Sequence, residues 1–275
     1  MTELQTKEFE LLKEFVSICE KLDLKYYLVC GSALGAEKYQ GFIPWDDDID
    51  VGLFRNDYKK FVEHAQEYLP DNIFLQNHET DPEFTQPYSK LRNSNTTYIE
   101  KSVSKLDINH GIYIDVFPLD GYPKDKKEIK KLEFLKKVYK LQIACAYRNE
   151  SSLKAKMFFS FERLLGFHKK TQKIVGKLER LISKYPCEGS ALICNHGNWQ
   201  GKLEYAQAEQ YGIGKDAEFE GLKVCVPEKI DDYLTQKYDD WRAELPEEKK
   251  IGHHYYLVCD ASKSYKYYVG KEENK

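Results

Sequence analysis

The stretch Gly41-Phe42-Ile43-Pro44-Trp45-Asp46-Asp47-Asp48-Ile49-Asp50-Val51-Gly52-Leu53 decides the fold of this chain. It places four carboxylates within five residues, and most acidic runs of this kind are solvated loops. Here, however, the apolar residues at positions 49, 51 and 53 alternate with Asp48, Asp50 and Gly52, which is the pattern of a half-buried strand. The sequence therefore favours a strand over a solvated loop.

The strand pattern has a chemical consequence for two of the acids. Residues two apart on a strand point to the same side, with Cα atoms roughly 6.6 Å apart. Asp48 and Asp50 should therefore share a face and can share Mg²⁺ or Mn²⁺, which prefer oxygen ligands. Asp46 has the same parity, but Pro44 and Trp45 place it before the strand. We predict a metal-binding pair at Asp48 and Asp50.

Upstream of the acids, the chain shows a helix, a strand and a turn. Apolar residues with helical spacing predict a helix over residues 4–22, and residues 26–30 read as a strand that stops at Gly31-Ser32. A helix should begin near Ala33. A Gly-Ser turn between strand and helix lets backbone N–H groups and a hydroxyl approach a phosphate. Gly31 and Ser32 are therefore candidate phosphate-binding residues.

The two motifs together resemble a known family. Gly31-Ser32-Ala33-Leu34-Gly35, followed by the acidic stretch 41–50, is similar to the LicD family of phosphocholine and related transferases, whose animal relatives are fukutin and fukutin-related protein. The resemblance implies an α/β (α+β) nucleotidyltransferase-like fold, with a mixed sheet, flanking helices and a helical insertion. The sequence departs from the family at residues 36–39, where Lys38 stands in place of the usual Arg-His pair and is the candidate phosphate contact there.

A second pair of charged residues lies at Lys90 and Arg92. In a strand they share a face and make a compact dication suited to a pyrophosphate, although cations also occupy ordinary exposed strand faces. The stretch around them resembles the Lys-Leu-Arg…Thr element of the same family. We predict that both residues bind the substrate.

A third acid interrupts the buried strand predicted over residues 111–121. Asp115 lies among apolar residues, and a buried carboxylate is costly unless it is paired or metal-bound. The family resemblance implies that Asp115 is the third catalytic and metal-binding acid, beside Asp48 and Asp50. Asp120 follows Pro118 at the end of the strand, where a turn or a cap explains it, so we predict a structural role for it.

The remaining chain divides into a helical insertion and a C-terminal segment. We predict a catalytic core over residues 1–123, a helical insertion over 124–196 and a segment over 197–275 that completes the domain. The aromatic run 157–161, near basic Lys154, Lys156, Lys169 and Lys170, could touch a membrane, although core packing is its default role. Cys187, Cys194 and His196 do not have the spacing of a common zinc motif, and a turn explains them more simply.

Length, charge and cysteine content indicate the class of protein and its cellular compartment. The chain has 275 residues and a net charge of −3, so no broad basic field favours nucleic acid. Its seven cysteines are odd in number and scattered, as in reduced cytosolic proteins. The sequence shows no signal peptide or membrane span. We expect a cytoplasmic protein, working in the cytosol or at the inner face of the membrane.

The resemblance implies a metal-dependent transferase. It would move phosphocholine, or a similar phospho-alcohol, from a CDP-activated donor to a sugar hydroxyl of a cell-surface glycan or teichoic acid precursor, with Mg²⁺ or Mn²⁺. The alternatives are a nucleotidyltransferase acting on an NTP and a non-catalytic glycan- or nucleotide-binding module. Aromatic residues interleaved with acids near the C-terminus favour a choline cation over a polyol: Trp199, Tyr205, Tyr211, Tyr233, Tyr238 and Trp241, with Glu204, Glu209 and Asp240.

Overall fold

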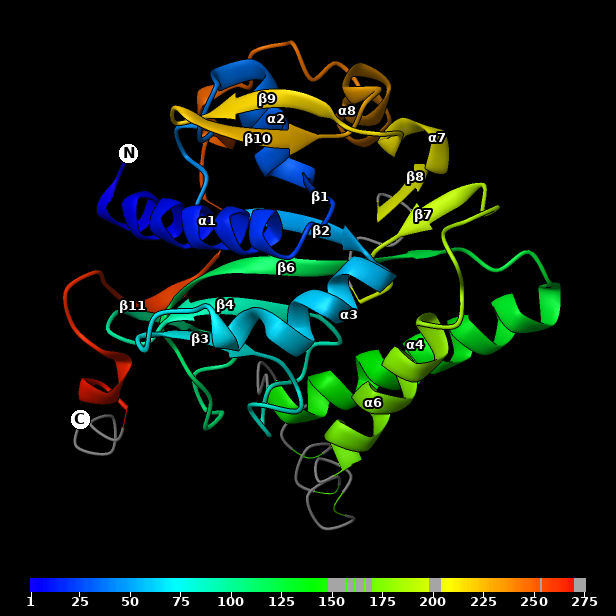
Figure 1. Cartoon of the computed structure of the whole chain (residues 1–275). Coiled ribbons are helices and arrows are strands. Elements are labelled where there is room, and N and C mark those ends of the chain that lie inside the picture. The colour runs from blue at the N-terminus through cyan, green and yellow to red at the C-terminus, as the bar shows by residue number, and fades with distance from the viewer. Residues whose placement is uncertain are drawn as a thin grey trace.

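A computed structural model describes residues 1–147, 157, 161, 166, 170–197, 204–252 and 254–269. At its centre lies a seven-stranded sheet (Figure 1). Its main path runs β1-β2-β6-β4-β3, and β7 and β8 extend it from the end of β6. The strands are β1 (Tyr26–Leu28), β2 (Asp50–Phe54), β3 (Ile73–Gln76), β4 (Ser89–Asn93), β6 (Ile112–Gly121), β7 (Leu192–Cys194) and β8 (Tyr205–Gln207).

The sheet is mixed, as the sequence predicted. β2 and β6 run parallel, whereas β1 pairs with β2, β4 with β6 and β3 with β4 in antiparallel fashion. Two smaller sheets accompany it, the hairpin β9 (Lys215–Phe219) with β10 (Leu222–Val226) and the pair β5 (Thr97–Glu100) with β11 (Tyr256–Asp260). The α+β architecture is therefore confirmed.

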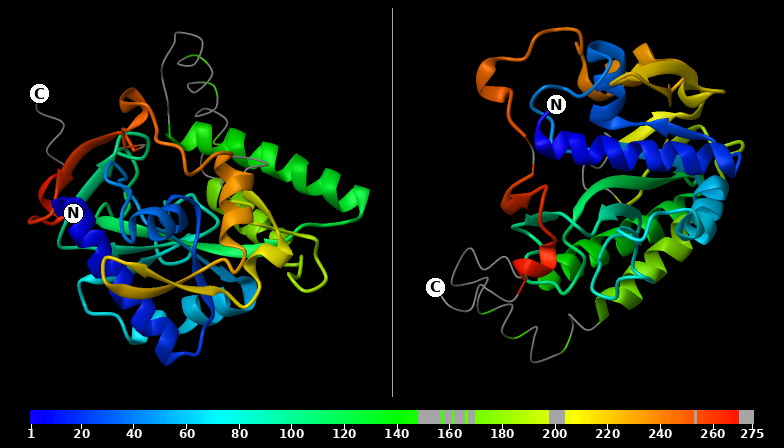
Figure 2. Two further views of the ribbon diagram at one scale, coloured as in Figure 1. Left: turned by 90° about the horizontal axis from the view of Figure 1, so that it is seen from above. Right: turned by 60° about the vertical axis from the view of Figure 1, so that its left-hand side comes forward.

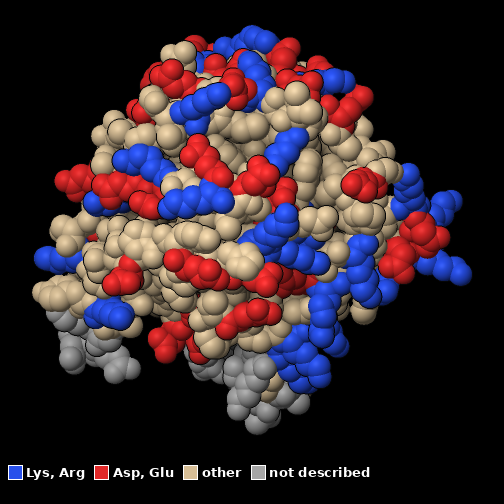
Figure 3. Space-filling model, in the orientation of Figure 1, with Lys and Arg blue, Asp and Glu red and all other residues tan. Residues whose placement is uncertain are grey.

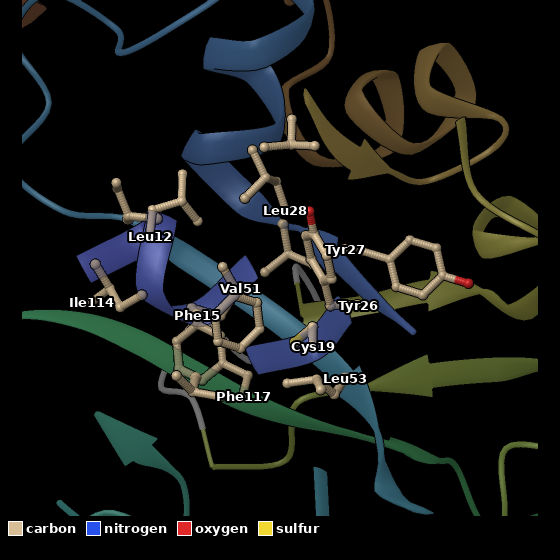
Figure 4. Packing of buried hydrophobic residues seen from close by; sticks show 14 of the residues in the cluster. Leu12, Phe15, Cys19, Tyr26, Tyr27, Leu28, Val51, Leu53, Ile114 and Phe117 are labelled. Atoms are coloured by element: carbon tan, nitrogen blue, oxygen red, sulfur yellow. The ribbon is translucent and has the colours of Figure 1, made fainter. Parts of the chain in front are cut away.

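One face of the sheet is covered by α1 (Glu3–Lys21) and α3 (Arg55–His64), which lie in front of it in Figure 1. α1 begins at a capping box, in which the Thr2 hydroxyl accepts a hydrogen bond from the Gln5 backbone N–H and the Gln5 side chain accepts one from the Thr2 N–H. The predicted helix over residues 4–22 is confirmed. Its apolar side packs on β2 and β6 in a continuous core that includes Phe15, Val51 and Ile114 (Figure 4).

The connection after β1 differs from the prediction. The helix α2 (Cys30–Tyr39) begins at Cys30 rather than near Ala33, so Gly31 and Ser32 lie in its first turn. Cys30 itself takes a left-handed backbone conformation, with φ 51°, and makes the switch from strand to helix. The Val29 N–H still donates to the Asp50 carbonyl at 3.0 Å, so pairing with the β2 segment continues to the point where the helix starts.

The part of the molecule above the sheet in Figure 1 is built from α2 and the C-terminal third. It contains α7 (Ala208–Tyr211), the β9–β10 hairpin and α8 (Ile230–Tyr238), with α2 packed against α8 and β9. Residues 239–252 then lead from α8 toward β11, and this segment is the orange ribbon at the left of the right-hand view in Figure 2. Short 3₁₀ helices cover Ala65–Glu67, Glu247–Lys249 and Tyr265–Tyr267.

The helices α4 (Lys126–Tyr147) and α6 (Thr171–Ile182) pack together below the sheet (Figure 1). They share a separate apolar cluster around Leu132, Tyr139 and Leu178. This agrees with the helical periodicity of residues 124–184. None of the helices in the described part of the chain is long and apolar enough to cross a membrane.

Candidate active site

A cavity of about 680 Å³ lies against the sheet face that α1 and α3 leave uncovered. The main strands, α2, α8 and the segment after α8 all contribute to its lining. The acids of the sheet form one wall, aromatic residues form another, and a third is made by residues 84–86 and 102–108 with Tyr147. The acids that line it are Asp46, Asp48, Asp50, Glu100, Asp115 and Asp240.

The register of three strands brings the central charges together. Asp50 on β2 is the parallel partner of Asp115 on β6, and Lys90 on β4 is the antiparallel partner of the same Asp115. Side chains in register point to the same face. The Lys90 ammonium lies 2.8 Å from an Asp115 carboxylate oxygen and also 3.3 Å from the centre of the Tyr113 ring. The predicted neighbourhood of Asp50 and Asp115 therefore exists.

Asp48 enters the cavity from just outside the sheet. The strand was predicted to include Asp48, but β2 begins at Asp50, so Asp48 precedes the strand. The Ile49 carbonyl nevertheless accepts a hydrogen bond from the Asp115 N–H at 2.8 Å, which fixes the chain beside β6. Asp46 also lines the cavity, although the sequence argument had placed it outside the pair.

The acids destabilise one another's charged forms. Burial, followed by the charges of Asp48 and Asp47, raises the pKa of Asp46 to about 8. Burial, followed by repulsion from Asp48 and Asp115, raises the pKa of Asp50 well above its ordinary value. Burial also raises the pKa of Asp48, although His254 and Lys90 oppose the shift. A cation placed among these carboxylates would therefore be favourable.

His254 is a component of the site to which the sequence argument gave no role. Its Nδ1 lies 3.1 Å from one oxygen of Asp47, its backbone N–H donates to the other at 3.0 Å, and its Nε2 lies 3.9 Å from Asp48. Burial alone would lower the pKa of His254, but the Asp47 hydrogen bond and the Asp48 charge raise it to about 9. Only the His253-His254 dipeptide near the C-terminus hinted at it, and His253 lies outside the described residues.

The donor set fits a hard divalent cation. Asp48, Asp50 and Asp115 offer carboxylate oxygens on one wall of the cavity, which suit Mg²⁺ or Mn²⁺. Within the described chain, a tighter group at the same wall consists of Asp47, Asp48 and His254, whose possible ligand atoms all lie within 4.8 Å of one another. Asp48 belongs to both sets, so either would place a cation at this wall.

Gly31 and Ser32 support the acidic stretch. A Cβ on Gly31 would lie 2.9 Å from an Asp46 carboxylate oxygen, so glycine allows that side chain to approach the helix start. Ser32 is buried, and its Oγ accepts a hydrogen bond from the Asp50 N–H at 2.8 Å. Gly31 lines the cavity, whereas Ser32 lies behind Asp50 and fixes the start of β2. Gly35 is needed because a Cβ there would overlap with the Gly41 carbonyl oxygen.

Lys38 lines the cavity but its ammonium points toward the C-terminal segment. It donates to the carbonyl oxygens of Arg242 and Ala243 at 3.1 and 3.0 Å, and lies 3.6 Å from Glu244. The contacts hold residues 241–244 beside α2. A role of Lys38 in binding phosphate stays a prediction, and the structure gives it a second role in shaping the cavity.

Lys90 and Arg92 both line the cavity, as their shared face predicted, but their surroundings differ. Arg92 is 1% exposed and donates from Nε to Gln76 at 2.5 Å and from an Nη to the Gly111 carbonyl at 2.7 Å. Burial alone would raise the pKa of Glu100, yet the two cations hold it below its usual value. Lys90 is thus the better placed of the two to meet a ligand.

Asp120 has the structural role that was predicted, for a different reason. It lies inside β6 rather than in a turn, and its carboxylate accepts two hydrogen bonds from Arg55, at 2.7 and 2.5 Å. Both side chains are buried. Residues five apart on a strand point to opposite faces, so Asp115 faces the cavity and Asp120 faces α3.

The aromatic residues of the C-terminal segment separate into two groups. Tyr238 and Trp241 line the cavity with Asp240, and Tyr39 and Trp45 line it from the α2 side. Four others lie elsewhere: Tyr211 and Tyr233 belong to the main core, Tyr205 packs on Tyr122 with ring centres 4.9 Å apart, and Glu209 pairs with Lys229. Trp199 is not among the described residues.

Cys187, Cys194 and His196 do not form a metal group. The Cys187 thiol donates to the Leu119 carbonyl at 3.2 Å, Cys194 is buried, and His196 Nε2 lies 3.0 Å from the Gly121 carbonyl oxygen. A local structural role explains these contacts. Of the predicted membrane-contacting stretch, residues 158–160 with Lys154, Lys156 and Lys169 lie outside the described residues.

Comparison with known proteins agrees with the motifs. Residues 23–150 match the family described as LicD/FKTN/FKRP, nucleotidyltransferase domain. The chain is 28% identical over 268 residues to the lipopolysaccharide cholinephosphotransferase LicD of Haemophilus influenzae, an alignment covering 92% of this chain and 96% of that protein. An uncharacterized protein of Rickettsia prowazekii is 29% identical over 116 residues, covering 42% of this chain and 40% of that protein. The resemblance drawn from the sequence is confirmed.

Proposed function

We propose that the chain is a phosphotransferase that moves phosphocholine from CDP-choline to a sugar hydroxyl of a cell-surface glycan, since residues 23–150 match the LicD/FKTN/FKRP family and the chain is similar to a cholinephosphotransferase. The observation that carries this proposal is the row Asp50–Asp115–Lys90 across three strands, with Asp48 beside it, on the wall of a cavity large enough for a nucleotide-activated donor.

The reaction exchanges the phosphoanhydride bond of the donor for a phosphoester bond to the acceptor. The acceptor hydroxyl oxygen bonds to the phosphorus that carries choline, and the bond from that phosphorus to the bridging oxygen breaks. CMP leaves with the electron pair, and the hydroxyl proton is released. When bound, Mg²⁺ or Mn²⁺ would offset the diphosphate charge and lower the pKa of the acceptor hydroxyl. Asp48, Asp50 and Asp115 would hold the ion.

The chain's own residues position the donor. Lys90 offers a cation to the diphosphate while Asp115 fixes its ammonium at 2.8 Å. Arg92, held by Gln76 and Gly111, adds a fixed positive charge behind it. The segment held by Lys38 forms part of the aromatic side of the cavity.

Choline is favoured over a polyol because of the aromatic wall. A trimethylammonium is recognised by aromatic faces, whereas ribitol or glycerol needs several buried polar partners. Tyr39, Trp45, Tyr238 and Trp241 line one side of the cavity, together with Asp240. Three of these rings already contact a lysine or arginine of the chain within 6 Å of the ring centre, so choline would share this wall with protein cations.

A donor panel tests the proposal. The protein would be incubated with a glycan acceptor that has free sugar hydroxyls and with CDP-choline, CDP-ethanolamine, CDP-glycerol or CDP-ribitol. Mg²⁺, Mn²⁺ or a chelator would be present, and the products would be identified by mass. We expect CMP release and a phosphocholine adduct, only with metal. A product that retains the nucleotide would instead identify a nucleotidyltransferase, and binding without turnover would identify a non-catalytic module.

Side-chain variants test the head-group assignment separately. Trp45→Ala and Tyr238→Ala should raise the KM for CDP-choline several-fold, whereas Tyr238→Phe should retain most of the affinity because the ring face remains. Tyr205→Ala is the matched control, since that ring packs on Tyr122. A clear preference for CDP-ribitol would refute the choline assignment and leave the metal site in place.

A further inference from the structure

The exposed face of α4 has an unusual composition. Nine of its residues are exposed, and six of them are lysines, at positions 126, 127, 130, 131, 137 and 140. The other three are Phe134, Leu141 and Ala144. The two acids of the helix, Glu128 and Glu133, are half-buried, and the Glu128 carboxylate accepts a hydrogen bond from the Tyr185 hydroxyl. The exposed face is therefore basic and apolar in a chain whose net charge is −3.

Helical geometry makes this a continuous surface. Residues seven apart lie almost directly above one another on an α-helix, so Phe134 and Leu141 form one line. They are 69% and 57% exposed. Lys130 and Lys137 form a second line beside them at the same spacing. The opposite side of α4 is buried against α6, so the line of Phe134 and Leu141 points away from the protein.

We propose that this face of α4 binds an anionic membrane surface. A helix that presents lysines around Phe and Leu has the composition of helices that lie in the plane of a membrane interface. The lysines attract anionic headgroups, and the two apolar side chains enter the headgroup boundary. Nucleic acid would engage the lysines but leave Phe134 and Leu141 exposed. An ordinary protein partner would have to bury six cations.

The second helix of the insertion adds positive charge to the same part of the molecule. The exposed residues of α6 are Lys173, Lys177 and Arg180, which share one face of that helix. Lysines and arginines gather over α6 and the first turns of α4 in Figure 3, at the lower right. We assign the membrane contact to α4 because the exposed apolar side chains lie there.

α4 is also connected to the cavity. Its last residue, Tyr147, receives a hydrogen bond from the Gln86 side chain at 2.6 Å, and its hydroxyl lies 2.9 Å from that of Thr85. All three residues line the cavity. A membrane-bound α4 would therefore hold this wall near the surface from which a lipid-anchored glycan could enter. That consequence rests on the proposed function, whereas membrane binding itself does not.

Vesicle binding of the full chain tests the proposal. The protein would be sedimented with vesicles of phosphatidylglycerol and phosphatidylcholine in equal parts, or of phosphatidylcholine alone, at low and high salt. We expect binding to anionic vesicles that is about tenfold or more stronger than to neutral ones and that weakens with salt. Phe134→Ser with Leu141→Ser, and separately Lys130→Glu with Lys137→Glu, should each reduce it about tenfold.

Matched controls lie on other surfaces. Ile213→Ser changes an apolar residue that is 81% exposed, and Lys60→Glu reverses an exposed charge on α3; both should bind vesicles as the wild type does. Unchanged melting temperature and donor hydrolysis would show that the α4 variants fold, and binding is measured without turnover, so an inactive enzyme would not affect the result. Equal binding to neutral and anionic vesicles, or wild-type binding by both α4 double variants, would overturn the proposal.

Discussion

Two aspartates on one strand provide the sharpest test of the division between chemistry and stability. Asp120→Asn and Asp115→Asn make the same isosteric change five residues apart on β6. The Asp120 carboxylate is fully buried and accepts two hydrogen bonds from Arg55, which is itself 6% exposed. Removing one partner of a buried ion pair costs about 3–5 kcal/mol, because the other charge stays buried without its partner.

The magnitude for Asp120→Asn lies near the lower end of that range. The new amide can still accept one hydrogen bond from Arg55, and Glu179 lies 3.6 Å from the same guanidinium. At about 2–4 °C per kcal/mol for a chain of this size, a loss of about 3 kcal/mol lowers the Tm by roughly 6–12 °C. Turnover of the surviving folded enzyme should change little, since Asp120 faces α3.

Asp115→Asn should show the reverse. It removes one of several mutually repelling carboxylates, which offsets part of the loss of the Lys90 ion pair, so the Tm should move by only a few degrees. Loss of the carboxylate from the reacting face should lower kcat on the order of 10²–10³-fold.

Differential scanning calorimetry and urea unfolding measure the first effect, and CMP release at saturating donor measures the second. The reasoning would be refuted if Asp115→Asn lowered the Tm more than Asp120→Asn, or if the two variants lost similar kcat at unchanged Tm.

The other expectations concern the remaining charged residues. Asp48→Asn and Asp50→Asn should each abolish turnover and weaken the rise in Tm that Mg²⁺ or Mn²⁺ gives the wild type; near-normal kcat in either would contradict the metal assignment. Lys90→Ala and Arg92→Ala should lower kcat/KM for the donor by the equivalent of roughly 1.5–3 kcal/mol each, with a fall in Tm for Arg92→Ala, whose partners are buried; unchanged donor kinetics in both would show that they serve only the fold. Burial, followed by the charge of Asp48, raises the pKa of Glu8 well above its ordinary value. As the pH rises above the ordinary pKa of a glutamate, the unfolded chain loses this proton before the native state does, so the native state loses stability. Glu8→Gln should therefore increase the Tm more at neutral pH than at pH 4. An equal increase at both pH values would rule out the titration of Glu8 as the cause.

The acids could be predicted because their signal is local. The alternation around Asp50 follows from a period of two, which survives in the folded strand. Asp115 was noticed because a lone carboxylate interrupts an apolar strand, and its place beside Asp50 was implied by the family resemblance. The same parity, applied to Asp120, would have placed it on the opposite face from Asp115. The prediction of a turn or cap at Asp120 rested only on the nearby Pro118, whereas the structure has a buried ion pair with Arg55 there.

Other parts of the site could not be predicted because they depend on contacts between distant segments. Asp47 and His254 meet across 207 positions of the chain, and Lys38 reaches Arg242 across 204. The spacing of apolar residues along the sequence does not predict contacts between segments this far apart. The predicted start of α2 was wrong for a local reason: the strand was expected to continue to residue 30, but Cys30 takes a left-handed conformation and begins the helix.

In the proposed function, the charge balance of the cavity would make binding of the donor depend on the metal. Carboxylates outnumber the cations that face them, so a diphosphate would meet net repulsion at the wall where it must bind. Burial, and after it repulsion from the neighbouring acids, raises the pKa of both Asp46 and Asp50. A divalent cation at Asp48 and Asp50 would remove this repulsion and give the phosphates a positive contact. In the proposed function, the quaternary ammonium would depend less on the metal, because Asp240 and the aromatic residues of the cavity can attract a cation. Removal of the metal should therefore weaken binding of the donor's diphosphate strongly. It should change the preference among head groups only slightly, as expected if aromatic contacts select the head group.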